Sequence, residues 1–441
     1  MNLADLTASQ LARMIDAGEI TSSALVEACL SRIGEKEDEV RAWTHLDRDL
    51  AMKQAAARDA SRAAGQPCGP LHGIPVGIKD IFDTADYPTE NGTPLHEGRT
   101  PAKDCTVVAR LREAGAVILG KTVTTELAVY SPGKTRNPHD LTRTPGGSSS
   151  GSAAAVAASM TPLAVGTQTN GSVIRPASFC GVFGYKPTQG LISRHGVLRQ
   201  SPPLDTVGVF ARSLEDLALI AGPLMSYDDR DPAMQPRTAP QIARIMAQEP
   251  PVEPDIAFVR TPVWGQAEET TKDAMRELIE HFGGRIALVD LPPDFEAALD
   301  TQRTIMEADL AYSFAREYRD GKDKISKVLC EMIERGQNVL ATEYHAAIAR
   351  AEAFNQELGE VFQEYDAILT PSTAGEAPVG LDKTGSPAFC TLWTLCGVPA
   401  INLPVLQGPN GMPLGVQLVG PRHDDARLFR NARWLLGQLE D

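Results

Sequence analysis

Three short stretches of the sequence carry side chains that could perform covalent chemistry together. Lys79 ends the apolar run "GIPVGIK", Ser148 lies in "TPGGSSSGSAAAVAAS", and Ser172 lies in "TQTNGSVIRPASFCG". A serine hydroxyl attacks a carbonyl carbon when a base takes its proton, and a lysine is a base only when it is neutral. The apolar neighbours of Lys79 favour that state, because burial lowers a lysine pKa from ~10.4 toward ~7 or 8, a difference worth about 4 kcal/mol.

The glycine- and serine-rich stretch over residues 144–159 is open to three interpretations. A run of this composition is most often a flexible loop. Glycines before a helix can also cradle a phosphate. The third interpretation is the floor of an active site, with "SAAAVAAS" as a helix whose small side chains let it lie close to a sheet. A lone lysine after an apolar strand is likewise most often solvated, so residue types alone do not decide.

A second stretch, "GAVILGKT" over residues 115–122, fits the phosphate-loop pattern G-x-x-x-x-G-K-[ST]. Such a loop follows a strand and offers exposed backbone N–H groups to the anion. Here residues 116–119, between the two glycines, are themselves the apolar strand, and buried strand residues cannot wrap a phosphate. We therefore interpret the match as a coincidence and expect Lys121 at a strand end.

Composition and charge argue against several classes of protein. The chain has 441 residues, 42% of them apolar, which is enough for a sizeable core. A net charge of −15 argues against nucleic-acid binding, because phosphates are bound by Lys and Arg. The N-terminus does not resemble a signal peptide, and no run reaches ~18 apolar residues, so we expect no membrane association and a cytoplasmic location.

Cysteines and histidines show no pattern for a disulfide framework or a metal site. The seven cysteines are odd in number and have no CxxC spacing, which favours a reducing cytosol. The eight histidines include no HxxxH pair, so we expect no metal and no other cofactor.

The pattern of apolar residues predicts an α/β protein with four sections. Residues 1–65 have helical periodicity and should pack as helices on a larger body. Over residues 66–225, short apolar runs broken by Gly and Pro alternate with helical stretches, as in a sheet protein. Residues 226–365 look mainly helical, apart from a strand, a helix and a strand over 256–292, and sheet-like runs return in residues 366–441.

The motifs of residues 66–220 resemble the amidase signature family in their order and spacing: "GPLHGIPVGIKD", "AGAVILGKT", "NPHD", "PGGSSSGSAAAVAA" and "GYKPTQG". The resemblance returns near the C-terminus in "GVPAINLPV" and "PLGVQLVG". It implies one catalytic domain, a central mixed β-sheet covered by helices on both faces. It also implies a Ser-cisSer-Lys triad, in which Ser172 is the nucleophile, Lys79 is the base and Ser148 relays the proton between them.

The same resemblance implies the other catalytic groups. A cis peptide bond would join Gly147 to Ser148. Ser148, or its neighbour Ser149 on the substrate side, would protonate the departing nitrogen. One oxyanion-hole donor is typically worth about 3 kcal/mol. Here the hole would consist of four consecutive backbone N–H groups, those of Thr169, Asn170, Gly171 and Ser172.

The sequence departs from the family at the nucleophile loop, where most members read "DTGGSIR". Gln168 and Ile174 stand where an Asp and an Arg usually pair, so both halves of that ion pair are missing together. Asn170 stands at a usual glycine, and Asn tolerates a left-handed backbone better than most residues. Arginine appears one position later, as Arg175, and this shifted pattern resembles malonamidase-type members.

Arg175 is the residue that points to a substrate. A guanidinium matches a carboxylate bidentately and stays charged, so we expect Arg175 to bind a carboxylate of the substrate. A structural ion pair, or a cap on backbone carbonyls, is the alternative role. A second polar contact could come from "TQRTIMEADLAY", where Gln302 and Arg303 are candidates.

These features predict an amidase that hydrolyses a small amide to a carboxylic acid and ammonia through a serine acyl-enzyme. The expected substrate carries a carboxylate, as in a dicarboxylic monoamide or a carboxylated urea derivative. The alternatives are a neutral or aryl amide hydrolase, and the glutaminase subunit of a tRNA-dependent amidotransferase, against which the missing Asp/Arg pair argues. Intact Lys79, Ser148 and Ser172 argue against a non-catalytic protein. The helical N-terminus and middle offer surfaces for a homodimer.

Overall fold

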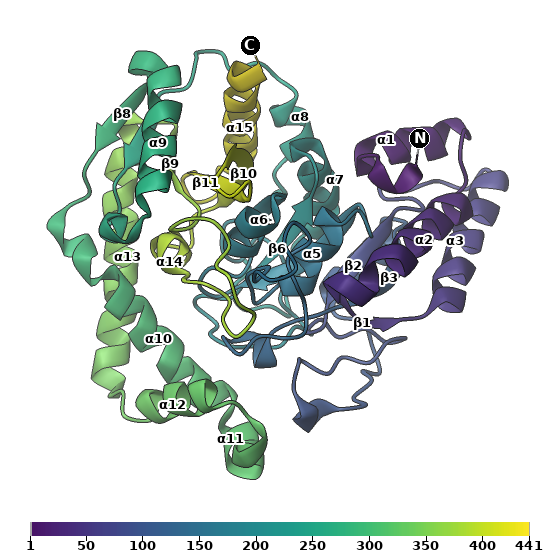
Figure 1. Cartoon of the computed structure of the whole chain (residues 1–441), viewed down its shortest axis with the longest axis horizontal. Coiled ribbons are helices and arrows are strands. Elements are labelled where there is room, and N and C mark those ends of the chain that lie inside the picture. Colours follow the sequence, from purple (N-terminus) through teal and green to yellow (C-terminus); the bar gives the residue numbers. More distant parts are fainter. Residues whose placement is uncertain (1, 441) are drawn as a thin grey trace.

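The computed structural model describes residues 2–440, and its centre is one mixed β-sheet (Figure 1). Its strands are β1 (Trp43–Leu46), β2 (Pro75–Lys79), β3 (Val117–Thr122), β4 (Leu163–Gln168), β5 (Phe183–Lys186), β6 (Thr206–Ala211), β7 (Ile256–Val259), β8 (Ile286–Val289), β9 (Ala367–Pro371), β10 (Ala400–Gln407) and β11 (Pro413–Val419). They hydrogen-bond in the order β1-β3-β2-β4-β6-β5-β10-β11-β9-β7-β8. The pairs β2/β3, β2/β4, β7/β8 and β7/β9 run parallel, and the other pairs run antiparallel.

Helices flank this sheet. They are α1 (Ala8–Ala17), α2 (Ser22–Val40), α3 (Arg48–Ala63), α4 (Thr106–Glu113), α5 (Ser150–Ala157), α6 (Ile174–Cys180), α7 (Leu214–Leu224), α8 (Ile242–Met246), α9 (Glu269–His281), α10 (Ala298–Ser313), α11 (Ala315–Gly321), α12 (Lys327–Gly336), α13 (Ala341–Glu364), α14 (Ala388–Leu395) and α15 (Asp425–Glu440). Helices α5 and α6 contact each other and the central strands, and α7, α8 and α15 form a second contacting group. The predicted α/β fold, a mixed sheet covered by helices on both faces, is confirmed.

Two parallel strands bring the first catalytic candidate to the nucleophile loop. Every residue of β2 and β4 is buried, which explains why both read as apolar runs rather than as alternating patterns. Ile78 of β2 pairs with Val165 of β4. Because parallel strands end at the same edge of a sheet, Lys79 at the end of β2 lies beside the end of β4, where residues 169–172 begin.

The four sections expected from the sequence share this single sheet. The N-terminal section contributes more than the predicted helices, because its strand β1 pairs with β3 at one edge. The section over residues 226–365 contributes β7 and β8 at the other edge, on either side of α9, as the strand, helix and strand pattern predicted. The rest of that section forms the helices α10 to α13, which extend away from the sheet in Figure 1.

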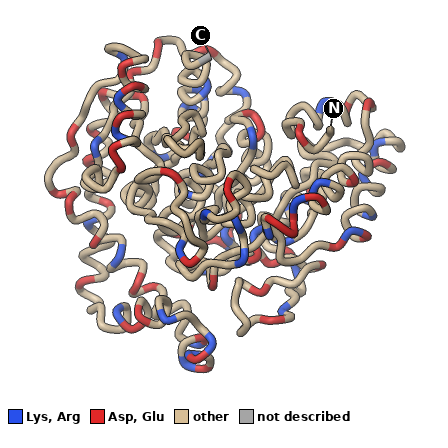
Figure 2. Tube along the Cα trace, in the orientation of Figure 1, with Lys and Arg blue, Asp and Glu red and all other residues tan. Residues whose placement is uncertain are grey.

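Charged residues are spread over the fold. Figure 2 shows acidic and basic side chains interleaved along most helices, in keeping with a net charge that comes from many scattered residues. Within residues 2–440, no helix is long and apolar enough to cross a membrane.

Candidate active site

Lys79 supplies a buried amine at the centre of the site. Its side chain is fully buried, and its Nζ lies 2.8 Å from Ser148 Oγ and 2.9 Å from Thr167 Oγ1. Burial lowers the pKa of Lys79 well below its usual range, while the negative charge of Asp205 opposes that effect. A neutral amine has a lone pair, so in that state Lys79 can accept a proton from Ser148 across the 2.8 Å contact.

Glycines bring the Ser148 loop close to the sheet. The peptide bond between Gly147 and Ser148 is cis, as predicted. Gly146 has a φ of 81°, in the left-handed region that other residues rarely adopt. At the start of α5, Gly151 lies so close to the backbone of Val123 that a Cβ there would clash. The stretch "TPGGSSSGSAAAVAAS" is therefore an ordered part of the site.

Ser172 lies directly before α6 and is partly exposed. The loops of Ser148 and Ser172 touch, because a Cβ on Gly146 would approach Pro176 Cα to 2.8 Å and Arg175 Nη2 donates to Gly147 O at 2.6 Å. Among residues 2–440, Ser148 Oγ is bonded to Lys79, and no hydrogen bond joins it to the Ser172 hydroxyl. The structure thus forms the Lys79 half of the expected relay and places the other half in an adjoining loop.

The predicted oxyanion-hole segment has free donors. In the part of the chain that the structure describes, none of its four backbone N–H groups donates a hydrogen bond to another residue. These groups belong to Thr169, Asn170, Gly171 and Ser172. A run of unpaired N–H groups at the start of a helix favours negative charge, which is what a tetrahedral intermediate carries.

Gln168 explains how the loop tolerates the missing ion pair. Its Oε1 accepts hydrogen bonds from the N–H groups of Val173 (2.8 Å) and Ile174 (3.0 Å), and its Nε2 donates to Thr394 Oγ1 at 2.9 Å. A neutral amide therefore caps the start of α6. Ile174 is fully buried among apolar residues, so neither position leaves a charge without a partner.

Asn170 is anchored at the floor of a cavity of about 420 Å³. Its Nδ2 donates to the Tyr130 hydroxyl at 3.1 Å, and its Oδ1 accepts from Thr391 Oγ1 at 2.7 Å. Gln302 reaches the same loop, with its Nε2 3.3 Å from Thr169 O. All but Thr169 line the cavity, so the sequence reasoning found Gln302 but missed Tyr130 and Thr391, which no motif marks.

The second candidate on α10, Arg303, also lines this cavity, at its rim. Its side chain is 61% exposed and pairs with Asp300 at 2.9 Å. Another ion pair, between Arg335 and the buried Glu307 at 2.6 Å, lines the same cavity. The helices α10 and α12 therefore supply its charged wall.

Arg175 is buried beside this cavity rather than exposed in it. Its side chain is 1% exposed, and its Nη2 donates to Gly147 O and, at 3.2 Å, to Thr384 Oγ1. Its Nε and Nη1 have no hydrogen-bond partner among residues 2–440. Burial lowers the pKa of the guanidinium, while nearby Cys390 and Tyr130 oppose that effect. Arg175 thus caps a carbonyl, the alternative role, and still has two free donors.

Ser149 corrects the sequence expectation. Instead of facing a substrate, its hydroxyl is fully buried and is bonded to the backbone of Thr167, donating to the carbonyl at 3.2 Å and accepting from the N–H at 3.3 Å. The reason is local geometry: Ser149 is the residue before α5, and its side chain turns toward β4 while that of Ser148 turns toward Lys79.

Lys121 lies within β3, and its motif forms the strand that the sequence predicted. The amine is fully buried and donates to Phe82 O at 2.9 Å and to Pro88 O at 3.2 Å. It also lies 3.3 Å from an oxygen of Asp80. Lys121 is therefore a structural clamp on the segment that follows β2, with no phosphate cradle around it.

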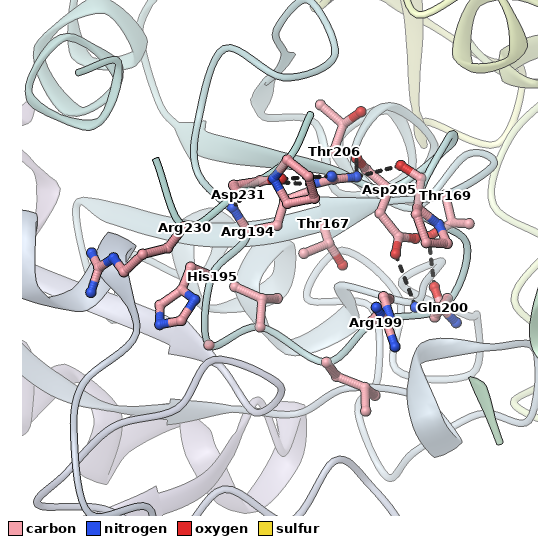
Figure 3. A pocket seen from close by; sticks show the side chains of 15 residues that line it. Thr167, Thr169, Arg194, His195, Arg199, Gln200, Asp205, Thr206, Arg230 and Asp231 are labelled. Carbon is pink, nitrogen blue, oxygen red and sulfur yellow. Dashed lines mark hydrogen bonds and ion pairs between the residues drawn. The ribbon is translucent and has the colours of Figure 1, made fainter. Parts of the chain in front are cut away.

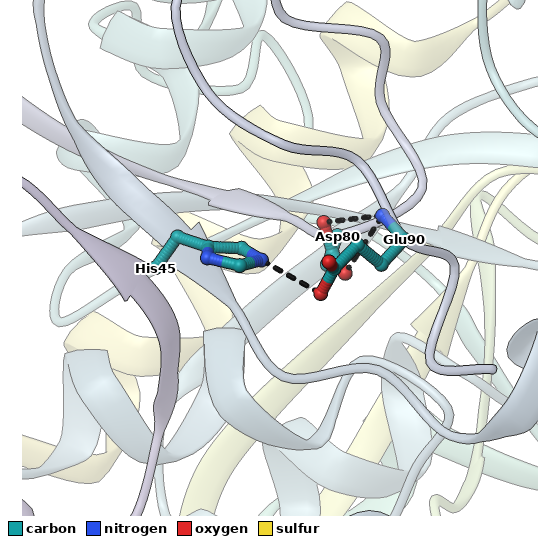
Figure 4. A group of neighbouring side chains, drawn as sticks. All are labelled: His45, Asp80 and Glu90. Carbon is teal, nitrogen blue, oxygen red and sulfur yellow. Dashed lines mark hydrogen bonds and ion pairs between the residues drawn. The ribbon is translucent and has the colours of Figure 1, made fainter. Parts of the chain in front are cut away.

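One group of possible metal ligands, His45, Asp80 and Glu90, lies behind that clamp (Figure 4). His45 Nε2 is 2.9 Å from Glu90 Oε2, and the Glu90 N–H donates to both oxygens of Asp80. The ammonium group of Lys121 already supplies a positive charge to Asp80. The group therefore works as a hydrogen-bond network that holds Asp80 next to Lys79.

Fold and site together define a hydrolase with an activated serine. A buried amine touches one serine, a second serine adjoins it, and free backbone N–H groups lie beside the second serine. The sequence model of the family named Amidase matches residues 24–429. The chain belongs to this family, the amidase signature enzymes, and is an amidase.

Known proteins resemble this chain over nearly its whole length. The glutamyl-tRNA(Gln) amidotransferase subunit from Rhodopirellula baltica is 34% identical over 475 residues, with 96% of this chain and 94% of the relative covered. Among solved structures, a chain of a vestigial protein complex linked to the origins of an s-triazine catabolic enzyme has 26% identity, 98% coverage of both chains and a TM-score of 0.92. The peptide amidase of Stenotrophomonas maltophilia has 28% identity, covers 99% of this chain and 97% of its own, and has a TM-score of 0.85.

Proposed function

We propose that the protein hydrolyses a small amide that carries a carboxylate, and releases ammonia. Ser172 is the nucleophile, neutral Lys79 is the base, and Ser148 passes the proton between them. The N–H groups of residues 169–172 hold the negative oxygen of the tetrahedral intermediate.

The reaction runs in two halves. In the first, Ser172 Oγ bonds to the amide carbon while its proton moves through Ser148 to Lys79, and the C–N bond then breaks as that proton returns to the nitrogen. In the second, water attacks the acyl-enzyme, gives one proton to the relay, and releases the acid as Ser172 Oγ regains that proton. The 2.8 Å contact between Lys79 and Ser148 supports the first step of this route.

The observation that carries the substrate class is Arg175. Two of its nitrogen atoms are buried without partners in the described part of the chain, three residues after the nucleophile. A buried, unpaired guanidinium donor is costly, and a carboxylate with two acceptor oxygens would satisfy both. A neutral amide of the same size has no group that would do so.

A second candidate is the glutaminase subunit of a tRNA-dependent amidotransferase. It is favoured by the relative from Rhodopirellula baltica, which is named for such an amidotransferase and matches almost end to end. Glutamine is itself an amide that bears a carboxylate, so Arg175 is compatible with both candidates. They differ in whether the isolated chain works and in whether glutamine is its substrate.

A substrate panel separates these candidates. Ammonia release by the purified chain would be measured with malonamate, with neutral malonamide and with glutamine. We expect turnover of malonamate, at least about tenfold lower kcat/KM for malonamide, and little for glutamine. Glutamine turnover that equals or exceeds malonamate turnover would favour the second candidate, and a preference for malonamide would refute both.

The matched variants are Arg175→Gln and Arg303→Gln. Both remove a guanidinium near the same cavity, but Arg303 is exposed and already paired. We expect Arg175→Gln to abolish the preference for the anionic amide and Arg303→Gln to preserve it. An unchanged preference in Arg175→Gln would show that the carboxylate binds elsewhere.

A further inference from the structure

A second cavity, of about 390 Å³, reaches the catalytic segment from elsewhere (Figure 3). It shares no lining residue with the cavity at Asn170, yet it includes Thr167 and Thr169. Thr167 is the hydrogen-bond partner of Lys79, and Thr169 begins the oxyanion loop. Asp205 also lines this cavity and is 8% exposed, so its carboxyl group has a route to solvent.

The hydrogen bonds around Thr169 need one proton more than the neutral side chains supply. Thr169 Oγ1 lies 2.6 Å from Gln200 Oε1 and 2.6 Å from Asp205 Oδ1, and a hydroxyl has one hydrogen for two acceptors. Gln200 cannot turn its amide around at no cost, because its Nε2 donates to Leu127 O at 3.0 Å. A protonated Asp205 resolves the conflict: it donates to Thr169, and Thr169 donates to Gln200.

The other oxygen of Asp205 is already satisfied as an acceptor. Its Oδ2 accepts from the N–H groups of Gln200 (2.9 Å) and Ser201 (3.0 Å). The proton therefore belongs on Oδ1, the oxygen that faces Thr169. Figure 3 shows Asp205, Thr169 and Gln200 turned toward one another at one end of the cavity.

The charges around Asp205 come from several elements. Lys79 faces it from β2 and is the amine whose charge it favours. Arg194 donates to its backbone oxygen at 3.2 Å and is held by Asp231 at 2.8 Å. The remaining charged or titratable groups that line the cavity are Arg199, His195 and Arg230.

We propose that Asp205 is a positioning residue of the reaction: protonated, it completes the hydrogen bonds that hold the oxyanion loop, and ionised, it favours the charged, inactive form of Lys79. The proposal rests on the proposed function only in taking Ser172 as nucleophile and Lys79 as base. Burial raises the pKa of Asp205 to about 6, so its charge changes in the range where many enzymes work.

The test follows the reactivity of Ser172 without any knowledge of the substrate. A fluorophosphonate probe that labels activated serines would be used, and its labelling rate measured from pH 5 to pH 10. Asp205→Asn copies the protonated carboxyl, with its amide N–H toward Thr169 and its oxygen toward Gln200 and Ser201. We expect it to fold, to keep the plateau rate within about threefold, and to move the acid limb at least about half a unit lower, because Lys79 loses a nearby negative charge.

Two further variants make the test specific. Asp231→Asn removes the same charge from the same cavity but touches neither Thr169 nor Lys79, so its acid limb should stay in place. Thr169→Val keeps the shape of the side chain without its hydroxyl, and should lower the plateau rate about tenfold while the acid limb remains. This second variant decides the positioning role even if Asp205→Asn fails to fold.

The outcomes separate the two proposals. Equal acid limbs in Asp205→Asn and the native chain, or equal shifts in Asp205→Asn and Asp231→Asn, would overturn the role of Asp205. So would an unchanged plateau in Thr169→Val. If Ser172→Ala still labelled at the native rate, the proposed catalytic assignment itself would fail.

Discussion

The amine of Lys79 and the hydroxyl of Ser148 lie 2.8 Å apart, and both side chains are shielded from solvent. The contact joins the last residue of β2 to the loop before α5, two segments 69 residues apart in the chain. Because burial lowers the pKa of Lys79, the pair can hold its proton on the serine and leave the amine free to act as a base.

Replacing the buried amine should exchange activity for stability. Lys79→Met is expected to be inactive and, at pH 7, more stable than the native chain, since a methionine needs no proton removed on folding. Between the lowered folded pKa and ~10.4, the unfolded native chain binds a proton that the folded chain lacks, so native stability rises with pH across that window. The stability advantage of Lys79→Met should therefore shrink between pH 7 and pH 10, by urea denaturation. A constant difference would mean that Lys79 is charged in the folded chain.

The two serines should differ in how their loss is felt. Ser172→Ala is expected to lower kcat at least about a thousandfold and to abolish fluorophosphonate labelling. Ser148→Ala should lower both rates by about a hundredfold or more while leaving Ser172 able to label slowly. Initial rates of ammonia release and labelling time courses would check this. Faster labelling in Ser172→Ala than in Ser148→Ala would reverse their roles.

Restoring the usual ion pair should show strong coupling. Gln168→Asp places an unpaired charge beside buried Ile174, and we expect a loss of about 3 kcal/mol in the free energy of unfolding. Ile174→Arg alone should also destabilise. The double variant should lose less than the sum of the two single variants, which a double-mutant cycle by denaturation measures. Additive losses would mean that the two side chains cannot pair in this fold.

Asn170 should limit the size of the substrate. Asn170→Gly removes a side chain from the cavity floor, and we expect kcat/KM for malonamate to fall about tenfold while bulkier anionic amides gain relative to it. Tyr130→Phe removes only the hydroxyl that holds Asn170, at 3.1 Å, and should change the rates for small and bulky amides by similar factors. An unchanged ratio in Asn170→Gly would place the size limit elsewhere.

Sequence reasoning reached the parts of the site that repeat in a family or follow a local rule. The buried strands β2 and β4 read directly as apolar runs, and Lys79, Ser148 and Ser172 followed from motifs at matching distances. Ser149 shows the limit of that approach. Its neighbour in sequence suggested a shared role, but adjacent side chains at the start of a helix turn to different partners.

The residues that sequence reasoning missed depend on contacts between distant segments. Asp205 meets Thr169 across 36 residues, and Tyr130 meets Asn170 across 40. Neither has a neighbouring pattern that announces its partner. The strand β1 was hidden for a related reason: its four residues lie between two long helices, and pairing with β3, rather than local preference, makes them a strand.

The pairing of β1 with β3 also sets a boundary for shortening the protein. The first 46 residues look like a detachable helical cap, yet they end in the strand that covers one edge of the sheet. Deleting them would leave β3 with a row of unpaired N–H and C=O groups, one strand away from Lys79. Such an open edge invites pairing with a neighbouring molecule, so a truncated form should tend to aggregate.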